Sequence, residues 1–259
     1  MTPAAIELAA VTKTFPAPEG AYTALESIDL CVPAYRFVAL AGPSGCGKTT
    51  LLNLMAGLAG PTSGAVRVFG EPLTGLNRRA SYLFQQDALL EWKTVEQNVA
   101  LGLVLRGVPT HGRVELWLDR VGLTPFRNYY PSQLSGGMRK RVALAQALVV
   151  EPDLVLMDEP FSALDVHTRL RMESELLDLW SSTRATVVFV THDLEEAIAL
   201  SDEVCVLSAG PASRIVGRYE VDLPRPRNLI DLKTEPGFQE LYRRVWSTLR
   251  GEVLRGPRA

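Results

Sequence analysis

Near the start of the chain stands the glycine-rich sequence Gly42-Pro43-Ser44-Gly45-Cys46-Gly47-Lys48-Thr49-Thr50. It follows an apolar run at 37–41 that is typical of a strand, and it leads into an amphipathic run at 49–58 that is typical of a helix. In such a loop, backbone N–H groups turn inward around a polyphosphate, the lysine reaches the β- and γ-phosphates, and the threonine hydroxyl faces Mg²⁺. The alternative is a glycine-rich turn with a chance lysine, which the flanking strand and helix disfavour. The sequence therefore predicts that the chain binds a nucleoside triphosphate.

Every residue of this loop is a candidate nucleotide contact, and Thr49 is also a candidate Mg²⁺ ligand. The set is Gly42, Pro43, Ser44, Gly45, Cys46, Gly47, Lys48, Thr49 and Thr50. A disulfide at Cys46 would obstruct the nucleotide, and no CxxC pair is formed with either of the other cysteines, Cys31 and Cys205. The chain has three cysteines, an odd number without a CxxC pair, and this favours a reducing cytosol.

Composition predicts a soluble globular protein. With 259 residues and 47% hydrophobic content, the chain can bury one core, or one core and a smaller subdomain. The formal net charge is −2, and lysines and arginines are scattered, so a nucleic-acid partner is not expected. No signal peptide is recognised, and no apolar run is long enough to span a bilayer. Any role at a membrane is therefore expected to depend on a partner protein.

Strand-like and helix-like segments alternate along the chain, as an α/β fold requires. Short apolar runs typical of strands buried on both faces occur at 37–41, 154–157, 186–190 and 203–207. Further strand-like runs, which predict an antiparallel β-layer beside the nucleotide, occur at 6–11, 24–32 and 65–69. From 95 to 150 the pattern is mostly helical, and a last helix is predicted at 238–249 after a proline-rich linker.

Two consecutive carboxylates, Asp158 and Glu159, follow the strand-like run 154–157. Ligands gather at the carboxyl ends of the strands in open parallel sheets. We predict that Asp158 holds Mg²⁺ and that Glu159 positions the attacking water and accepts its proton; an ordinary solvated turn is the alternative. The three histidines do not form a zinc-type spacing, and no serine lies in a nucleophile elbow, so neither a transition metal nor covalent catalysis is expected.

A second anion site is predicted at Leu134-Ser135-Gly136-Gly137-Met138, before a long helical run. The Ser135 hydroxyl and the N–H groups of Gly136 and Gly137 would lie at the helix N-terminus, where negative charge is favoured. One chain cannot easily fold both phosphate-binding devices onto a single nucleotide. Two copies related by twofold symmetry can, if each places its Ser-Gly-Gly turn over the other's phosphates. The pattern therefore predicts a homodimer that encloses ATP.

With these motifs, and with Phe161-Ser162-Ala163-Leu164-Asp165 and Val190-Thr191-His192-Asp193 in order behind them, the chain resembles the ATP-binding subunit of an ABC transporter. The resemblance covers nearly the whole chain. It implies an α/β P-loop NTPase fold: a RecA-like core, an N-terminal antiparallel β-layer and an inserted α-helical subdomain. It also implies an ATPase domain at 1–225, with the helical subdomain at about 93–150, and a short C-terminal linker and helix at 226–259.

The resemblance assigns roles to residues outside the phosphate loop. Gln85 would contact Mg²⁺ and the attacking water, and the loop after it would touch the membrane partner. Asp165 would lie at the dimer seam. His192 would hydrogen-bond the γ-phosphate, the alternative being that it only neighbours a helix cap. Phe15 would stack on adenine, although an aromatic side chain more often packs, and Tyr22 is an alternative for this role.

The row from Phe84 to Trp92 resembles importer subunits of the nitrate, sulfonate and taurine type, which share Phe-Gln-x-x-x-Leu-Leu-Pro-Trp, but here Glu91 replaces the proline. A second departure is Ala34-Tyr35-Arg36, where most relatives have a Gly-Glu turn; its effect is expected to be structural. The likeness implies a subunit peripheral to the cytoplasmic face of the cell membrane. Its partners would be integral-membrane permease subunits and, indirectly, a solute-binding protein.

Other function classes fit less well. A chromosome- or repair-type ATPase would carry coiled-coil heptads or basic arms, and a small P-loop kinase would lack the Leu134–Met138 motif. The remaining alternative is the ATPase of a two-gene exporter or lipoprotein-release system. The apolar Leu89, Leu90 and Trp92 are expected to form the wall of a groove for a permease helix, unless they pack the helical subdomain.

Overall fold

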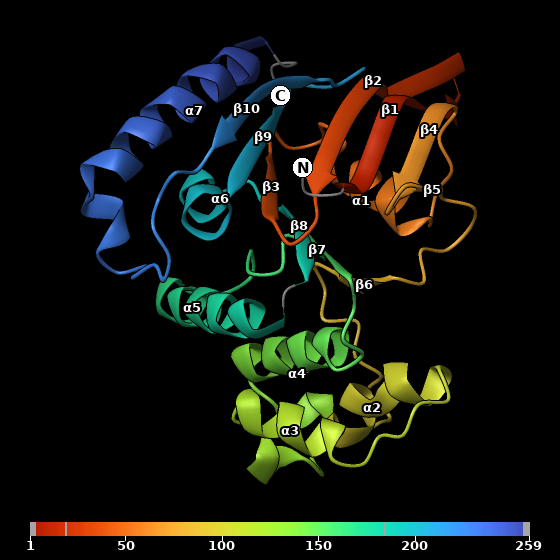
Figure 1. The fold of residues 1–259 in the computed structure, drawn as a ribbon, viewed down its shortest axis with the longest axis vertical. Coiled ribbons are helices and arrows are strands. Elements are labelled where there is room, and N and C mark those ends of the chain that lie inside the picture. Colours follow the sequence, from red (N-terminus) through yellow and green to blue (C-terminus); the bar gives the residue numbers. More distant parts are fainter. Residues whose placement is uncertain (1–3, 19, 184, 256–259) are drawn as a thin grey trace. The chain divides into compact units, whose positions relative to one another are not determined.

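The computed structural model describes residues 4–18, 20–183 and 185–255 (Figure 1). They form two compact units. The first contains the described residues up to Arg78 together with those from Thr186 onward, and the second runs from Arg79 to Ala185. The segment at about 93–150 that was expected to be a helical subdomain lies inside the second unit, whereas the C-terminal helix belongs to the first.

The N-terminal part of the first unit is an antiparallel sheet, as predicted. Its strands are β1 (Ala4–Ala17), β2 (Gly20–Pro33), β4 (Ser63–Val68) and β5 (Glu71–Pro72), in the order β2-β1-β4-β5. Pairs such as Ile6 with Val32 place buried side chains opposite one another. The hairpin extends well past the predicted strands, because residues 14–17 still pair with residues 20–23.

The first unit also contains a second group of strands, of which β3 and β8 precede predicted site residues. These are β3 (Phe37–Ala41), β8 (Thr186–Val190), β9 (Glu203–Leu207) and β10 (Ile215–Glu220), in the order β10-β9-β3-β8. β3 is parallel to both of its neighbours. All residues of β3, β8 and β9 are buried, which explains why these strands are apolar except for Thr186 and Glu203 at the first positions of β8 and β9. The buried carboxylate of Glu203 forms an ion pair with Arg218. β10 was not predicted, because it is an antiparallel edge strand whose residues alternate between half-buried and exposed.

The helices of the first unit are α1 (Lys48–Ala56), α6 (Leu194–Leu200) and α7 (Pro236–Arg255), with a 3₁₀ turn at η3 (Leu232–Thr234). α7 packs against α6, β9 and β10. It is longer than the predicted 238–249, and it buries the apolar residues Phe238, Leu241, Val245 and Leu249. In its last turns the buried carboxylate of Glu252 accepts a hydrogen bond from the N–H of Ala209 at 3.2 Å.

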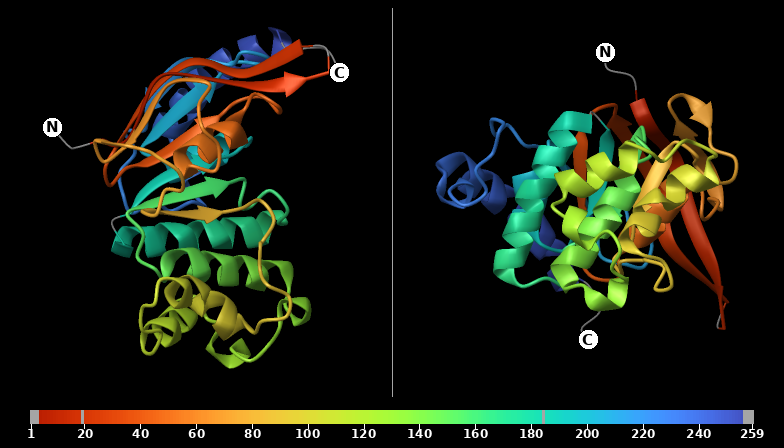
Figure 2. Two further views of the ribbon diagram at one scale, coloured as in Figure 1. Left: turned by 90° about the vertical axis from the view of Figure 1, so that its right-hand side faces the viewer. Right: turned by 90° about the horizontal axis from the view of Figure 1, so that it is seen from below.

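The second unit contains a parallel pair of strands, β6 (Ala80–Leu83) and β7 (Leu154–Asp158), and four α-helices. The helices are α2 (Val95–Leu105), α3 (Arg113–Arg120), α4 (Gly136–Leu148) and α5 (Val166–Thr183), with 3₁₀ turns at η1 (Thr124–Phe126) and η2 (Pro131–Gln133). α4 packs against α2, α3, α5 and β6, so it is the central helix of this unit (Figure 2). The prediction of helices without a strand between 95 and 150 is confirmed.

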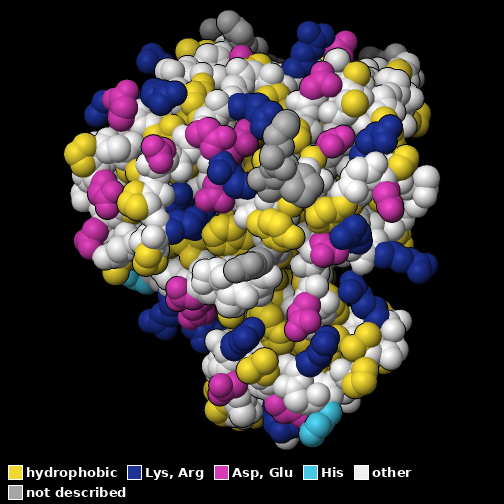
Figure 3. Space-filling model, in the orientation of Figure 1, with side chains coloured by type: hydrophobic (Ala, Val, Ile, Leu, Met, Phe, Trp, Pro, Cys, Tyr) yellow, Lys and Arg dark blue, Asp and Glu magenta, His cyan; other side chains and the backbone are white. Residues whose placement is uncertain are grey.

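The surface carries mixed charge. On the face drawn in Figure 3, lysine and arginine side chains alternate with aspartate and glutamate, and neither sign dominates a large area. This agrees with the scattered charges and the formal net charge of −2. Among the described residues, no helix combines the length and the apolar character that crossing a bilayer demands.

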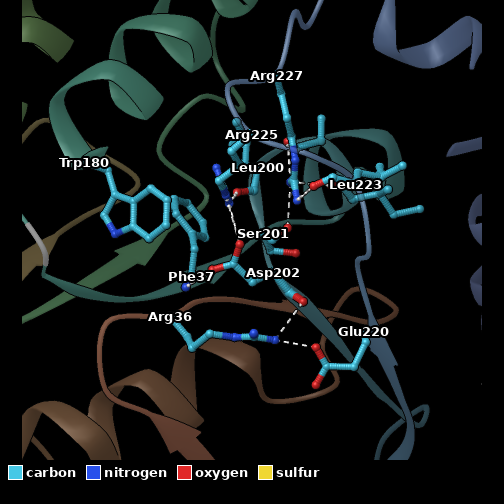
Figure 4. A network of polar contacts seen from close by, with 12 residues as sticks. Arg36, Phe37, Trp180, Leu200, Ser201, Asp202, Glu220, Leu223, Arg225 and Arg227 are labelled. Atoms are coloured by element: carbon cyan, nitrogen blue, oxygen red, sulfur yellow. Dashed lines mark hydrogen bonds and ion pairs between the residues drawn. The ribbon is translucent and has the colours of Figure 1, made fainter. Parts of the chain in front are cut away.

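A polar network fixes the start of β3 in the first unit (Figure 4). One carboxylate oxygen of Asp202 accepts from the N–H of Phe37 at 2.9 Å, and the other accepts two bonds from Arg225 at 2.8 and 3.0 Å. Arg36 donates to the carbonyl of Asp202 at 3.2 Å and forms an ion pair with Glu220. Arg36 lies in the segment that departs from the family pattern, so the departure has a structural role here.

Arg227 completes the same network at the end of α6 (Figure 4). Its guanidinium donates to the carbonyls of Ile198, Ala199 and Ser201 at 3.3, 2.9 and 2.7 Å. Burial, followed by repulsion from Arg225, lowers the pKa of Arg227 to about 10. The group therefore stays charged at neutral pH, and a cation at a helix C-terminus stabilises the helix.

We predict that Asp202→Ala lowers the free energy of unfolding by about 2 kcal/mol, because it removes the acceptor shared by a backbone N–H and a guanidinium. Urea denaturation followed by circular dichroism measures this change. Glu220→Ala is the control, since it removes only the exposed end of the Arg36 pair, and such surface pairs contribute at most about 1 kcal/mol. An equal decrease in the free energy of unfolding in both variants would contradict the larger contribution that we assign to Asp202.

Candidate functional site

The phosphate loop joins β3 to α1 in the first unit, as predicted. Its backbone needs glycine at particular points. Gly47, at the N-cap of α1, has a φ of 89°, in the left-handed region that residues with a Cβ rarely adopt. A Cβ on Gly42 would lie 2.8 Å from the sulfur of Cys46 and 3.1 Å from the carbonyl oxygen of Leu207. The loop therefore runs close against the end of β9, at a distance that only glycine permits.

Lys48 is buried in this loop. Its Nζ donates to the carbonyl oxygens of Gly42 and Pro43 at 2.9 and 3.0 Å, so the ammonium group lies within the curve of the loop. Cys46 is also buried, and burial raises the pKa of its thiol, although the nearby Lys48 acts in the opposite direction. The thiol is therefore neutral at physiological pH. Thr49 is exposed in the first turn of α1, where a hydroxyl can meet a ligand.

Phe15 and Tyr22 are direct cross-strand partners in the β1–β2 hairpin. Both rings are partly exposed, and the Nζ of Lys13 lies 5.0 Å from the centre of the Phe15 ring. A Cβ built on Gly210 would lie 3.2 Å from the carbonyl oxygen of Gly45 and 3.6 Å from the hydroxyl of Tyr22. Tyr22 therefore reaches toward the phosphate loop, and both aromatic residues stay candidates for the adenine contact.

His192 follows β8 and is exposed. The residue that caps α6 is its neighbour Asp193, whose carboxylate accepts from the N–H groups of Glu195 and Glu196 at 2.9 and 3.3 Å. The sequence 193–196 was expected to be a helix cap, and it is one. His192 itself makes none of these capping bonds, so its position at the strand end leaves it accessible to a ligand.

The second unit brings Gln85, Asp158 and Glu159 together at the end of β7. Asp158 is buried, whereas Glu159 is half-buried and has a φ of 43°. The Nε2 of Gln85 lies 3.4 Å from a carboxylate oxygen of Glu159. The carbonyl of Glu159 is held by the hydroxyl of Ser162 at 3.0 Å. Because a left-handed glutamate is strained, and such strain gathers at functional sites, this turn is a candidate catalytic element rather than an ordinary loop.

Tyr82 is a site residue that sequence reasoning missed. Its hydroxyl lies 3.5 Å from a carboxylate oxygen of Asp158. Burial, and then the charge of Asp158, raise the pKa of Tyr82, so the phenol stays neutral and can donate to the carboxylate. Tyr82 lies in β6, a strand that was not predicted. Its place three residues before Gln85 is the only signal that the sequence offers.

Ser135 is the N-cap of α4, and its hydroxyl oxygen accepts from the N–H of Met138 at 3.3 Å. Ser135, Gly136 and Gly137 border a hollow of about 380 Å³ that Asp165 also lines. The carboxylate of Asp165 accepts from the N–H groups of His167 and Thr168, both at 3.1 Å, at the start of α5. A hydrogen bond from the side chain of Thr168, followed by these backbone bonds, lowers the pKa of Asp165.

The hollow is suited to an anion. Two helix N-termini, those of α4 and α5, meet at its border, and Arg141 and Arg171 line it as well. Backbone N–H groups and guanidinium groups are the donors that bind phosphate in proteins. The second unit therefore has a candidate anion-binding surface of its own, besides the phosphate loop in the first unit.

Comparison with known proteins agrees with this reading. A family model described as ABC transporter matches residues 25–162. An uncharacterised ABC transporter ATP-binding protein of Methanocaldococcus jannaschii is 44% identical over 248 residues, which cover 95% of this chain and 91% of the relative. The nitrate import ATP-binding protein of Synechococcus elongatus is 40% identical over 236 residues, which cover 89% of this chain and 86% of the relative.

A solved structure gives the same result for the fold. An ATP-binding cassette determined as a dimer in a post-hydrolysis state, bound to ADP and Pi, is 32% identical and matches with a TM-score of 0.75. The match covers 85% of this chain and 100% of the cassette. The predicted P-loop NTPase fold is confirmed. This chain belongs to the ABC transporter family and is one of its ATP-binding ATPase subunits.

Proposed function

We propose that this chain hydrolyses ATP to drive an importer for nitrate, a sulfonate, taurine or a related small solute. One observation carries the proposal: the chain holds a phosphate loop in one unit and, in the other, a hollow bordered by the Ser135–Gly137 turn, which we assign to an anion. A small kinase or a simple nucleotide-binding protein has no use for the second surface. A subunit that closes on a partner's ATP needs both.

Hydrolysis is assigned to residues that border the phosphates. Lys48 neutralises the β- and γ-phosphates, and Glu159 positions a water molecule and accepts its proton. Gln85 and His192 contact the water and the γ-phosphate. Thr49, Gln85 and Asp158 offer hydroxyl, amide and carboxylate oxygens, and hard oxygen donors of this kind suit Mg²⁺. When bound, Mg²⁺ neutralises charge on the β- and γ-oxygens.

The working form is a homodimer. The Ser135–Gly137 turn of one copy contacts the γ-phosphate of ATP held by Lys48 of the other, and Asp165 lies at the seam between the copies. The dimeric state of the solved cassette supports this arrangement. Residues 1–225 serve as the ATPase domain, and residues 226–259 add a linker and helix to it.

A permease is the second partner. A hollow of about 280 Å³ in the second unit is lined by β6 and the chain that follows it, by α2 and by α4. Phe84, Leu101 and Leu105 give it an apolar wall, and Leu105 is 78% exposed. We assign this hollow to a short cytosolic helix of the permease, because the adjoining chain carries Gln85, which would transmit the state of the nucleotide.

The wall of this hollow differs from the predicted one. Leu89, Leu90 and Trp92 are not among its lining residues. Leu89 and Leu90 are half-buried, and the backbone of Leu90 is bound on both sides by the buried amide of Asn98, so that part of the loop is used for packing. Trp92 is 73% exposed and does not belong to the lining of this hollow.

The direction of transport and the solute are inferred from the relatives. The Synechococcus relative is a nitrate import protein, which favours import over a two-gene exporter or lipoprotein-release system. An importer of this type places the subunit at the cytoplasmic face of the membrane and adds a solute-binding protein to the assembly. A neighbouring gene for an importer-type permease would support this choice, and a lone exporter-type permease would refute it.

We predict that Glu159→Gln still binds ATP but that turnover falls by at least about 100-fold, since general-base catalysis contributes roughly 10²–10⁴ to a rate. Lys48→Ala should instead lose ATP binding, because no ammonium group then neutralises the negative charge of the phosphates. Fluorescent-nucleotide binding and phosphate release measure the two effects. Near-normal hydrolysis by Glu159→Gln would show that another group activates the water.

We predict that the chain is mainly monomeric without nucleotide and that the Glu159→Gln variant dimerises when ATP is added, because ATP supplies much of the contact. Light scattering measures the molar mass in solution and so distinguishes the monomer from the dimer. Adding Ser135→Arg should abolish this dimer by filling the second anion site. Ser132→Arg, at an exposed serine outside the hollow, should leave it intact. A dimer unaffected by Ser135→Arg would refute the shared nucleotide site.

We predict that Leu105→Ser weakens co-purification with the permease and uncouples transport, while the ATPase rate of the isolated subunit and its melting temperature stay unchanged. Exposed apolar side chains contribute to binding rather than to the core. Leu116→Ser is the matched control, since Leu116 is an exposed leucine of the same unit on α3, outside the hollow. Equal behaviour of the two variants would exclude this hollow as the docking site.

A further inference from the structure

Lys140 is a buried lysine in α4, the helix that begins at the Ser135–Gly137 turn. It is 5% exposed, and Lys48 is the other buried lysine in the part of the chain that the structure describes. The Nζ of Lys140 donates to the carbonyl oxygen of Gln85 at 2.7 Å and lies 2.9 Å from a carboxylate oxygen of Asp87. Removing a lysine from water is costly unless hydrogen bonds and an opposite charge replace the water, and here both do.

These contacts define the position of the Gln85 loop, residues 84–90. The loop has no helical or strand structure. Asp87 is held a second time, by the Nε of Arg139 at 3.2 Å, and Arg139 also donates to the carbonyl of Leu134 at 2.9 Å. Two successive residues of α4 thus bind the loop through side chains. Lys140, rather than a neighbouring strand, therefore holds the backbone of Gln85 in position.

The contacts continue from the loop to the catalytic carboxylate. The side-chain nitrogen of Gln85 lies 3.4 Å from Glu159, while its backbone carbonyl is bound by Lys140. Lys140 lies five residues after Ser135, which places it about one and a half turns from the helix N-terminus. A shift of α4 would therefore move Gln85 relative to Glu159, because the helix and the loop are joined by two ion pairs to Asp87 and by the hydrogen bond from Lys140 to the carbonyl of Gln85.

We propose that Lys140 is a positioning residue that ties the Gln85 loop to α4. When the Ser135–Gly137 turn contacts the nucleotide of the partner copy, α4 takes up a defined position. Lys140 then sets the position of Gln85 beside Glu159 of its own chain. The proposal rests on the proposed roles of Ser135, Gln85 and Glu159, and it adds a physical link between the two nucleotide sites of the dimer. Without Lys140, each site would bind ATP but would act with a misplaced Gln85.

The proposal competes with a purely structural role, in which the Lys140–Asp87 pair only stabilises the unit. The two roles predict different effects on the rate when two mutations are combined in one variant. Residues that act through one another give non-additive effects, whereas independent stabilising contacts add. The rate constant kcat is the right quantity, because ATP capture depends on Lys48 in the other unit and is expected to stay intact.

The experiment uses the full chain and four variants: Lys140→Met, Gln85→Ala, the double variant, and Arg113→Met as a control. Arg113 is an exposed cation of the same unit, 3.7 Å from Glu151, and has no place in the nucleotide site. We expect Lys140→Met to lower kcat about tenfold, equal to about 1.4 kcal/mol, with the ATP dissociation constant changed less than about twofold. The double variant should be no slower than Gln85→Ala alone, and the control should match the wild type.

All rates are measured well below the melting temperature of each variant. If Lys140→Met does not fold, Asp87→Asn replaces it, since it keeps the shape of the loop but removes its charge. Additive losses, or a normal kcat with only a lower melting temperature, would overturn the role of Lys140 while leaving that of Gln85 in place. A normal kcat for Gln85→Ala would instead overturn the proposed role of Gln85 and this inference with it.

Discussion

The backbone N–H groups at the start of α1, together with the ammonium group of Lys48, form the site that we propose for the triphosphate, and its geometry constrains the surrounding structure. A triphosphate exchanges water for these donors, so the donors must already be in place when it arrives. They are in place because the loop cannot move independently of the sheet. Gly42 packs against the backbone of Leu207, and the opposite end of β3 is fixed by the bond from Phe37 to Asp202. The phosphate loop thus takes its rigidity from a strand held at both ends.

The turn after β7 shows the opposite balance, because there a strained backbone coincides with the carboxylate that we propose as the catalytic base. A φ of 43° is unfavourable for a glutamate, and strain of this kind costs on the order of 1–3 kcal/mol. Glycine would remove the strain but has no carboxylate. The turn also separates two adjacent carboxylates by environment, since Asp158 is buried with the strand whereas Glu159 is half-buried. Neighbouring residues of the same chemistry can therefore carry different roles.

The sequence predicted those features that require a run of neighbouring residues. It did not predict contacts between single residues that lie far apart in the chain. β3, β8 and β9 were predicted because strands buried on both faces require nearly continuous apolar runs, and the loop 42–50 was predicted because phosphate binding requires glycines at a fixed spacing. Lys140 and Tyr82 were missed. Each is a single polar residue whose partner, Asp87 or Asp158, lies more than fifty positions away. Periodicity contains no information on such contacts.

The missed contacts share a physical property that suits moving parts. Apolar packing is non-directional, whereas a hydrogen bond between a side chain and the backbone sets a position and contributes only a modest net free energy. The Gln85 loop is held in this way by Lys140, and the N–H of Ala209, next to the Gly210 that borders the phosphate loop, is held by Glu252. Both ties connect a helix to a loop near a predicted nucleotide contact. A subunit that must close around ATP and reopen after hydrolysis requires loops whose positions are well defined but not permanently buried, and charged side chains reaching from helices meet both conditions.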